Sequence, residues 1–336
     1  MKTYLLALVA TAALAASPTY KVVGKIKIGG DGRWDYCYLD SANHRLYVSH
    51  GTQTEVVDTA TDKLVGTIPD TKGVHGIAVA NDLGRGFTSD GADNDVTVFD
   101  LKTLKVLNKV KTGQNPDAII YDPASRRVFT FNGPSGDSTA IDAASGTVAG
   151  TLPLGGRPEF AVADGKGNVY ANLEDKSTVV AIDSQKLTVE SRWPLAPGEE
   201  PSGMAMDRDH RRLFSGCHNR MMVVMYADSG KVVATPPIGQ GVDANAFDPG
   251  TGLAFSSNGD GTLTVVRQES PDKYSVVDSV QTQRGARTMA LDLKTHNVYL
   301  VTAEFGPPPA PTADQPRPRP SMVPGSFVVL VVSRQR

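Results

Sequence analysis

The sequence predicts an all-β fold, a seven-bladed β-propeller of four-stranded antiparallel blades, from two observations. A polar residue followed by a short apolar strand recurs every 40 to 44 residues along the 336-residue chain. The last repeat lacks an outer strand, whereas an unassigned strand precedes the first repeat. Self-similarity at this period is typical of blades arranged radially around a central channel.

The innermost strand of each blade lines the channel of a propeller, so the polar residue that opens each repeat should belong to a ring. The openings read Trp34-Asp35-Tyr36, Val74-His75-Gly76, Pro116-Asp117-Ala118, Pro158-Glu159-Phe160, Pro201-Ser202-Gly203, Val242-Asp243-Ala244 and Ala286-Arg287-Thr288. The predicted ring is therefore Asp35, His75, Asp117, Glu159, Ser202, Asp243 and Arg287.

The third repeat illustrates the predicted elements. The inner strand covers 116–122, the second strand 128–131, the third 139–142 and the outer strand 147–154. Clusters of Gly, Pro, Asn, Asp and Ser separate these apolar runs, which is the pattern of short strands joined by tight turns. No amphipathic helical stretch competes with this interpretation.

The two ends of the repeat array should form one blade. The seventh repeat supplies three strands, at 289–292, 296–301 and 327–332, and residues 20–29 resemble an outer strand such as 231–234. We expect the N-terminal strand to complete the last blade, because ring closure removes the free sheet edges that promote aggregation.

Residues 1–16 are predicted to be a signal peptide, and 17–336 a single propeller domain. Lys2 precedes an apolar run that ends in Ala13-Leu14-Ala15, a small-x-small cleavage pattern. The run is too short to span a bilayer comfortably, so we expect a periplasmic or secreted protein with no membrane span after cleavage, the alternative being a retained anchor. Cys37 and Cys217 lie in distant repeats, so we expect no disulfide framework.

Composition bears on the partner. The net charge is −2 at pH 7 and 21% of residues are charged, with Lys and Arg scattered along the chain. A nucleic-acid partner is therefore unlikely, because such proteins carry a concentrated basic surface.

The repeat resembles the YVTN-type β-propeller family, the YncE-like proteins, over nearly the whole mature chain. The resemblance rests on openings such as Gly113-Gln114-Asn115-Pro116-Asp117, on second strands such as Leu46-Tyr47-Val48-Ser49, and on third strands ending in aspartate, such as Val98-Phe99-Asp100. Lactonase-like seven-bladed propellers are more distantly similar. The resemblance implies the fold but no single function, because such propellers include solute and protein binders, a proposed single-stranded DNA binder and lactonase-like enzymes.

The candidate site is the ring together with the loops between second and third strands, which share one face of a propeller. The predicted ligand-binding residues are Asp35, Asp117, Asp243, Arg287, Asn132 and Asn258. The predicted metal ligands for one divalent ion (Zn, Mn or Ca) are His50, His75, Glu159, Glu174, His218 and Glu304. Crowded carboxylates raise one another's pKa unless a cation neutralises them, which Arg287, protonated His75 or a metal could do. The alternative for each acid taken singly is that it only accepts backbone hydrogen bonds from its own loop.

An insertion at 303–325 in the seventh repeat is rich in proline, and it should emerge on the ring face. Stiff proline-rich chain could cover the channel mouth and bring Arg317 and Arg319 towards an anionic ligand, or could contact a protein partner. The alternative is an exposed loop without a role.

Three functions fit these patterns. The first is an exported protein that binds a small polar or anionic ligand in the channel, either directly or through a divalent metal. The second is a lactonase-like hydrolase or sugar-acid lyase at the same place, with His75, Glu159 and His218 as candidate catalytic residues. The third is a protein-interaction platform without catalysis.

Overall fold

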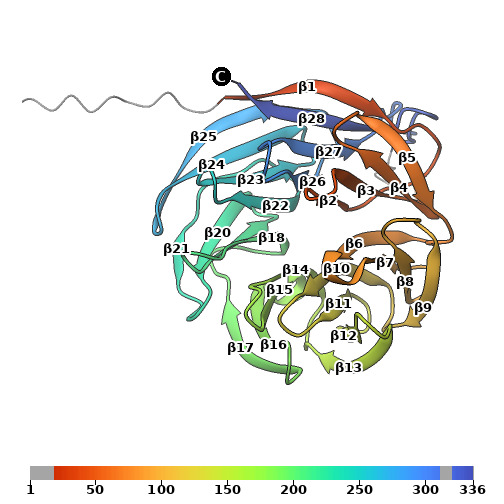
Figure 1. The fold of residues 1–336 in the computed structure, drawn as a ribbon. Helices are drawn as coiled ribbons and strands as arrows, with labels where there is room; N and C mark the ends of the chain where they lie inside the picture. Colours follow the sequence, from red (N-terminus) through yellow and green to blue (C-terminus); the bar gives the residue numbers. More distant parts are fainter. Residues whose placement is uncertain (1–18, 311–319, 336) are drawn as a thin grey trace, which may run out of the picture.

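Seven four-stranded antiparallel sheets surround one central channel in the computed structural model, which describes residues 19–310 and 320–335 (Figure 1). The predicted all-β, seven-bladed propeller is confirmed. In each of the first six blades the strands follow one another in chain order from the channel outwards.

The blades have the following strands. Blade 1 comprises β2 (Cys37–Asp40), β3 (Arg45–His50), β4 (Gln53–Asp58) and β5 (Lys63–Ile68); blade 2 comprises β6 (Val74–Ala80), β7 (Arg85–Asp90), β8 (Asp95–Asp100) and β9 (Val106–Lys111). Blade 3 comprises β10 (Pro116–Asp122), β11 (Arg127–Asn132), β12 (Asp137–Asp142) and β13 (Thr147–Pro153); blade 4 comprises β14 (Pro158–Ala163), β15 (Asn168–Leu173), β16 (Thr178–Asp183) and β17 (Thr188–Pro194). Blade 5 comprises β18 (Pro201–Asp207), β19 (Arg212–Cys217), β20 (Met221–Tyr226) and β21 (Val232–Ala234); blade 6 comprises β22 (Val242–Asp248), β23 (Leu253–Asn258), β24 (Thr262–Ser270) and β25 (Lys273–Gln281). Blade 7 comprises β26 (Thr288–Leu291), β27 (Val298–Thr302), β28 (Val328–Arg334) and β1 (Tyr20–Lys27).

Only two single-turn 3₁₀ helices, Asn81–Leu83 and Glu174–Lys176, interrupt the strands of the described residues. Two predicted boundaries differ from the structure, since Asp35 and Arg287 lie before β2 and β26 rather than inside them. The Asp35 N–H donates to the Ser49 hydroxyl (2.7 Å) instead of entering the strand ladder.

Burial separates the central strands from the outer ones. In β11 and β19 nearly every residue is buried, because neighbouring blades cover both faces of the sheet, whereas the outer strand β17 alternates between exposed and half-buried residues. This is the alternation expected of a strand with one solvated face.

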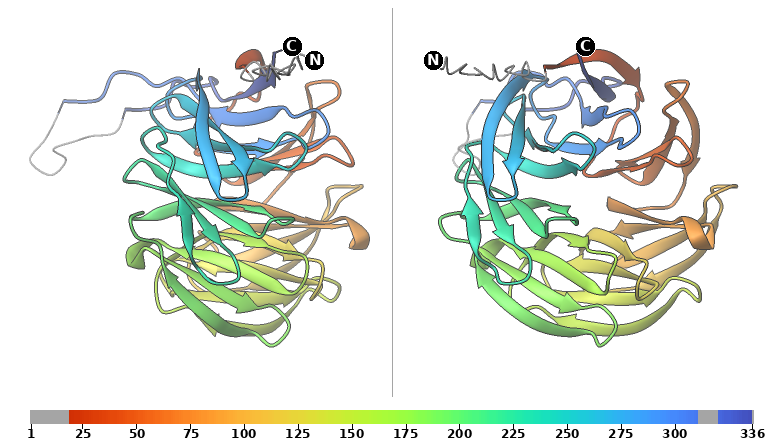
Figure 2. Two further views of the ribbon diagram at one scale, coloured as in Figure 1. Left: turned by 90° about the vertical axis from the view of Figure 1, so that its left-hand side faces the viewer. Right: turned by 60° about the vertical axis from the view of Figure 1, so that its left-hand side comes forward.

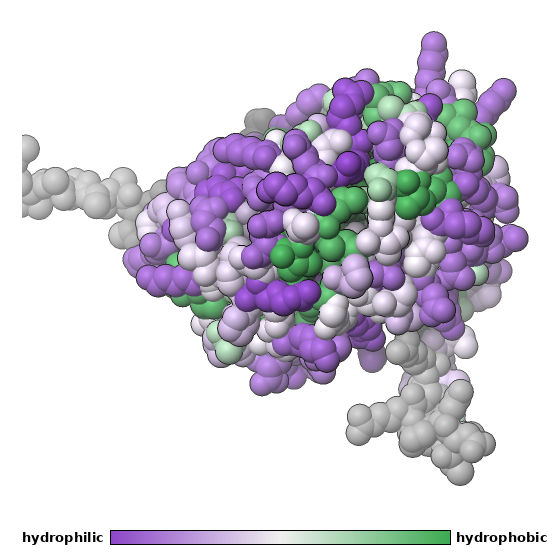
Figure 3. All heavy atoms as spheres, turned by 90° about the horizontal axis from the view of Figure 1, so that it is seen from below, coloured by the Kyte–Doolittle hydropathy of each residue, from purple (hydrophilic) through white to green (hydrophobic). Residues whose placement is uncertain are grey.

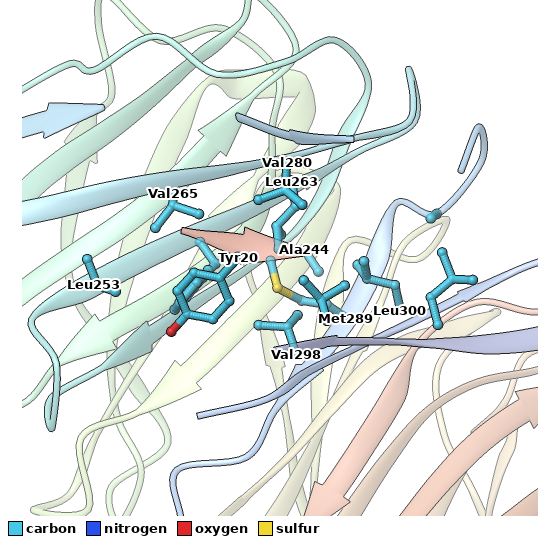
Figure 4. Close-up of a cluster of buried hydrophobic side chains, with 13 residues drawn as sticks. Tyr20, Ala244, Leu253, Leu263, Val265, Val280, Met289, Val298 and Leu300 are labelled. Carbon is cyan, nitrogen blue, oxygen red and sulfur yellow. The ribbon is translucent and has the colours of Figure 1, made fainter. Parts of the chain in front are cut away.

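The N-terminal strand closes the ring as predicted. β1 pairs antiparallel with β28, from Tyr20 opposite Arg334 to Lys27 opposite Val328. The Tyr20 ring packs edge-to-face on Phe255 of blade 6 at 5.3 Å, within an apolar cluster shared by blades 6 and 7 (Figure 4). The first strand therefore contributes to the core of two blades, and the sheet of blade 7 depends on both ends of the array.

Small residues allow the inner strands to converge on the channel. Gly203 follows the ring residue Ser202, and a Cβ at this position would lie 2.6 Å from the Ala244 Cα of the next blade. Such an approach is closer than van der Waals contact permits, so only glycine fits between these two strands.

The surface is mostly hydrophilic with separate apolar patches on the side seen from below in Figure 3. Outer strands leave single apolar side chains exposed, among them Leu64, Leu107 and Val148, which is ordinary for a protein surface. In the described part of the chain, no helix has the length and apolar character needed to cross a membrane. The predicted signal peptide lies outside the described residues. Cys37 and Cys217 are both buried, and neither forms a disulfide.

The described parts of the proline-rich insertion, residues 303–310 and 320–325, lie between β27 and β28 and extend away from the body of the molecule (Figure 2). Its base is ordered by an antiparallel bridge between Phe305 and Met322 and by Trp34, which packs on Phe305 at 5.9 Å and stacks on Phe327 at 5.1 Å. Arg317 and Arg319, predicted to reach an anionic ligand, lie outside the described residues.

Candidate ligand site in the central channel

A cavity of about 540 Å³ occupies one mouth of the channel. It is lined by ring residues and by loops that join second and third strands: Asp35, Asn115, Asp117, Gly133, Pro134, Arg157, Glu159, Glu174, Ser202, His218, Gly241, Val242, Asp243 and Arg287. The structure thus brings together side chains that are separated by up to 250 residues. Such a cavity is in the size range of small-molecule sites.

Hydrogen bonds between blades fix the backbone of the ring. The Ser89 hydroxyl accepts from the Gly76 N–H (2.9 Å) and donates to the Asp117 carbonyl of the next blade. The Thr288 hydroxyl donates to the Asp35 carbonyl (2.7 Å), across the junction of blades 7 and 1. Because these bonds use backbone groups, they orient the ring carboxylates without neutralising them.

Among the described residues, three ion pairs link ring residues of adjacent blades, and two of them are short. The His75 Nδ1 donates to the Asp35 Oδ2 at 2.6 Å, and the Arg287 Nε lies 2.8 Å from the Asp243 Oδ2. The Ser202 hydroxyl donates to the other oxygen of Asp243 at 2.9 Å. Asp35 and Asp243 therefore each form a short ion pair with a cationic side chain of the next blade.

The imidazole of His75 is held in its protonated form. Burial alone would lower its pKa, but the hydrogen bond to Asp35 and the charge of Asp117 outweigh burial and raise the pKa to about 9. The lack of a side chain at Gly91 makes room for the imidazole of His75, since a Cβ there would lie 2.7 Å from the His75 Nε2. At neutral pH the imidazolium lies between two carboxylates.

Asp117 and Glu159, on neighbouring blades, form no ion pair as short as these among the described residues. The closest cationic nitrogen to Asp117 among the described residues is the His75 Nδ1, at 3.6 Å from Oδ1. Burial raises the pKa of Asp117 well above its usual range, and the charges of Asp35 and Glu159 add to this shift. Burial also raises the pKa of Glu159 to about 7, with the charge of Asp243 acting in the same direction. Asp35 and Asp117 share a single imidazolium, and the charges of Arg157 and Arg287 lower the pKa of Glu159 without outweighing burial. The ring therefore holds four carboxylates, those of Asp35, Asp117, Glu159 and Asp243, against two cationic side chains, His75 and Arg287.

The negative charge of Asp243, in blade 6, is more fully balanced than that of Asp117 or Glu159, because Arg287 lies 2.8 Å away. Its pKa is raised to about 6 by burial, and the guanidinium of Arg287 limits that shift. In turn the charge of Asp243 raises the pKa of Arg287, which stays protonated.

Two aromatic side chains that follow ring residues meet across the channel. Tyr36 of blade 1 and Phe160 of blade 4 pack edge-to-face at 5.1 Å, a contact between non-adjacent blades that only the channel can accommodate. Burial raises the pKa of Tyr36 well above its usual value, and the nearby charges of Asp117 and Glu159 reinforce this. The aromatic pair therefore narrows the channel close to the carboxylates of the ring.

The rim is polar and extends outwards over blades 3 and 4. Arg157 forms an ion pair with Glu174, and the His218 Nδ1 lies 3.9 Å from the other oxygen of Glu174 and 3.4 Å from Glu200. A second hollow of about 790 Å³ shares Gly133, Pro134, Arg157 and Glu174 with the first. The Arg157–Glu174 pair thus stands at the junction of two connected spaces.

Several predicted site residues lie elsewhere. Asn132 and Asn258 are fully buried inside their own blades, where their amides bond to hydroxyls of Thr139 and Thr264 at 3.0 and 3.1 Å. Both asparagines therefore stabilise the second-to-third-strand hairpin and do not line the cavity.

His50 and Glu304 are also separate from the cavity. His50 is buried between the β1–β2 connection and Phe327, whose ring is 4.7 Å away, and its Nδ1 lies 3.2 Å from the Glu55 Oε1. Glu304 is exposed at the base of the proline-rich insertion. Of the predicted metal ligands, His75, Glu159, Glu174 and His218 remain at or beside the cavity.

Sequence reasoning did not single out Tyr36, Phe160, Arg157 or Asn115. A signal was present for the first two, because the position after the ring residue is Gly, Ala or Thr in five repeats and aromatic only in the repeats of Tyr36 and Phe160. No comparable pattern marks Arg157, which reaches the cavity from the connection between blades 3 and 4.

Comparisons with known proteins support the fold alone. No family model matches the chain, and no curated protein matches it. Among solved structures, the chain is similar to Kuenenia stuttgartiensis hydrazine synthase (TM-score 0.69, 14% identity, 89% of this chain and 96% of that chain covered). It is also similar to the structure of U3-55K (TM-score 0.74, 9% identity, 93% and 98% covered). At such identities the likeness extends to the propeller and not to the activity.

Proposed function

We propose that this protein binds a small polar ligand in the channel cavity, together with positive charge that the ring itself does not supply. The observation that carries this proposal is the excess of carboxylates in the ring, where two cationic side chains, His75 and Arg287, face the four carboxylates of Asp35, Asp117, Glu159 and Asp243. Carboxylates that are held close together with little access to water repel one another. A ligand that brings a cation relieves this repulsion and is therefore bound more tightly.

The preorganised backbone supports binding rather than a purely structural channel. Serine and threonine hydroxyls hold the ring residues in place, and Tyr36 with Phe160 narrows the channel. The resemblance of the repeat to YVTN-type propellers agrees with this, since they include solute binders. We also propose export through the predicted signal peptide, which accords with a site open to extracytoplasmic solutes.

The test is a thermal-stability screen of the purified chain. The panel contains divalent cations, primary amines, dicarboxylates with and without a divalent cation, and neutral sugars. A ligand present at 100 times its Kd should raise the Tm by about 5 °C, since such an excess adds about 2.7 kcal/mol. Glu159→Gln should reduce the shift several-fold, whereas Asp209→Asn, an exposed carboxylate on the opposite face, should leave it unchanged.

Stabilisation by anions without any cation would contradict the proposal, as would an unchanged shift in Glu159→Gln. A melting temperature that responds to no member of the panel would favour the interaction platform instead.

Catalysis is a second candidate, favoured by the pKa of Glu159 at about 7. A carboxyl group that titrates near neutral pH is suited to proton transfer in a lactonase-like hydrolase or sugar-acid lyase. Turnover of a lactone or uronide substrate that is lost in Glu159→Gln would identify the enzyme; ligand binding without turnover would identify the binding protein.

A further inference from the structure

We propose that Asp35, His75 and Asp117 form a site for one divalent transition-metal ion, with Mn²⁺ or Zn²⁺ as the chemical class, at the wall of the cavity. This inference rests on the proposed function and deepens it, since it names the source of the positive charge. Ligand atoms of the three side chains lie within 4.8 Å of one another, and among the described residues they are the only such group of three.

The donor set comes from three consecutive blades. The His75 Nδ1 is 2.6 Å from the Asp35 Oδ2 and 3.6 Å from the Asp117 Oδ1. One imidazole nitrogen with two carboxylate oxygens is a mixed donor set that suits Mn²⁺ and Zn²⁺, whereas Ca²⁺ prefers oxygen donors alone.

A second observation is the free coordinating atom of Asp117. Its Oδ1 is buried and has no hydrogen-bond partner among the described residues, although the same residue lines the cavity. Buried carboxylate oxygens are normally satisfied, so an unsatisfied one beside two further ligand atoms points to a missing cation.

The backbone around the three ligands is already fixed. Ser89 joins the Asp117 carbonyl to the N–H that follows His75, and the Asp35 N–H is bonded to Ser49. A further backbone bond runs from the Tyr36 N–H to the His75 carbonyl at 3.1 Å. These backbone bonds would hold the three ligands in register. A metal ion would take the place of the proton that the His75 Nδ1 donates to Asp35, because an imidazole nitrogen binds a metal only in its deprotonated form.

Three protein ligands leave at least one coordination position open. Asp35 and Asp117 line the cavity, so the open position faces the space in which a small ligand would lie. A ligand with carboxylate or hydroxyl oxygens could complete the coordination sphere there, with Glu159 and Arg157 on the same wall. The site therefore predicts oxygen-donor polar molecules as the ligand class.

The molecule contains a matched control on its opposite face. His210 Nδ1 lies 2.7 Å from the Asp207 Oδ2, a separation close to that of the His75–Asp35 pair, but within residues 19–310 and 320–335 no third metal-type ligand completes a group there. Substitution of this histidine tests whether an Asp–His pair alone suffices to bind metal.

The experiment is equilibrium dialysis of the chelator-treated full chain against Zn²⁺, Mn²⁺ or Co²⁺, with Ca²⁺ in a parallel dialysis, followed by metal analysis and, for Co²⁺, by absorption spectroscopy. We expect one ion per chain, with Kd raised more than about tenfold in His75→Asn and in Asp117→Asn. His210→Asn should match the wild type. Circular dichroism must show that the variants are folded; Asp117→Asn preserves shape and serves if His75→Asn does not fold.

Absence of stoichiometric binding by the wild type would overturn the site, and so would binding of Ca²⁺ in preference to all three ions. Metal lost equally in Glu159→Gln and His75→Asn would place the ion elsewhere in the ring. If metal binding fails while cationic organic ligands still stabilise the wild type, this inference falls and the proposed function stands. If the metal binds but no small ligand adds stability, the metal site stands and the proposed ligand-binding function falls.

Discussion

The two ends of the inner strands carry acids of opposite character. Glu159 stands at the start of β14 and Asp164 follows its end, five residues later. Asp164 accepts hydrogen bonds from the N–H groups of Lys166 (2.7 Å) and Asn168 (3.0 Å) and pairs with Arg211 at 2.8 Å. Burial acts to raise the pKa of Asp164, but these bonds outweigh burial and lower it, whereas the pKa of Glu159 is raised to about 7.

The same contrast recurs around the ring. Acids at the strand ends, such as Asp40, Asp207 and Asp248, accept backbone N–H groups of their own turns at 2.9 to 3.3 Å. Acids at the strand starts face the channel and one another. A turn aspartate is therefore satisfied locally by the chain that follows it, and a channel acid depends on what enters the cavity.

The largest expected effect on stability comes from the acid at the end of the inner strand, in the turn that follows β14. Asp164→Ala removes a buried acceptor of several N–H groups and leaves Arg211 without one of its partners, so we expect a loss of about 3 kcal/mol in the free energy of unfolding. Urea denaturation measures it. Asp183→Ala, in a comparable but more exposed turn, is the control and should lose clearly less; equal losses would show that burial of the turn acid is irrelevant.

An intermediate effect is expected from opening the channel. Phe160→Ala removes the ring that meets Tyr36 and should reduce stability by about 2 kcal/mol, since Phe160 is only partly buried. Water reaching the acids should also lower the pKa of Glu159 towards its ordinary value. Carbon-13 NMR titration of the Glu159 carboxyl group checks this; an unchanged pKa would mean that the aromatic pair does not limit its hydration.

The smallest expected effect on stability comes from Glu159, the acid that faces the channel at the start of β14. The pKa of Glu159 is higher in the folded chain than its ordinary 4.5, so its contribution to stability is complete below that value and is lost as pH rises through about 7. Glu159→Gln should make the fall in stability between pH 5 and pH 8 shallower by about 1 kcal/mol, after allowance for partial exposure. Denaturation across this pH range measures it, and a steeper fall in the variant would reverse the assigned sign.

The sequence predicted the fold and which residues open each inner strand, but not which side chains of the ring contact one another. The period predicts where each inner strand starts, so Asp117 and Glu159 could be assigned to the channel from spacing alone. Asn132 and Asn258 were predicted to bind ligand because their loops share the ring face, yet their amides turn into the blades. Loop position does not determine side-chain direction, which depends on the donors and acceptors of neighbouring strands.

The repeat, its period and the unmatched strand at 20–29 were properties of the sequence, because they arise from local patterning that each blade repeats independently. The convergence of Tyr36 with Phe160, the sharing of His75 between Asp35 and Asp117, and the approach of Arg157 from the next connection were decided by the tertiary structure. Ring closure sets these contacts, since it brings residues about 40 positions apart or more to within a few ångströms, where charge and burial act on groups that the linear chain keeps separate.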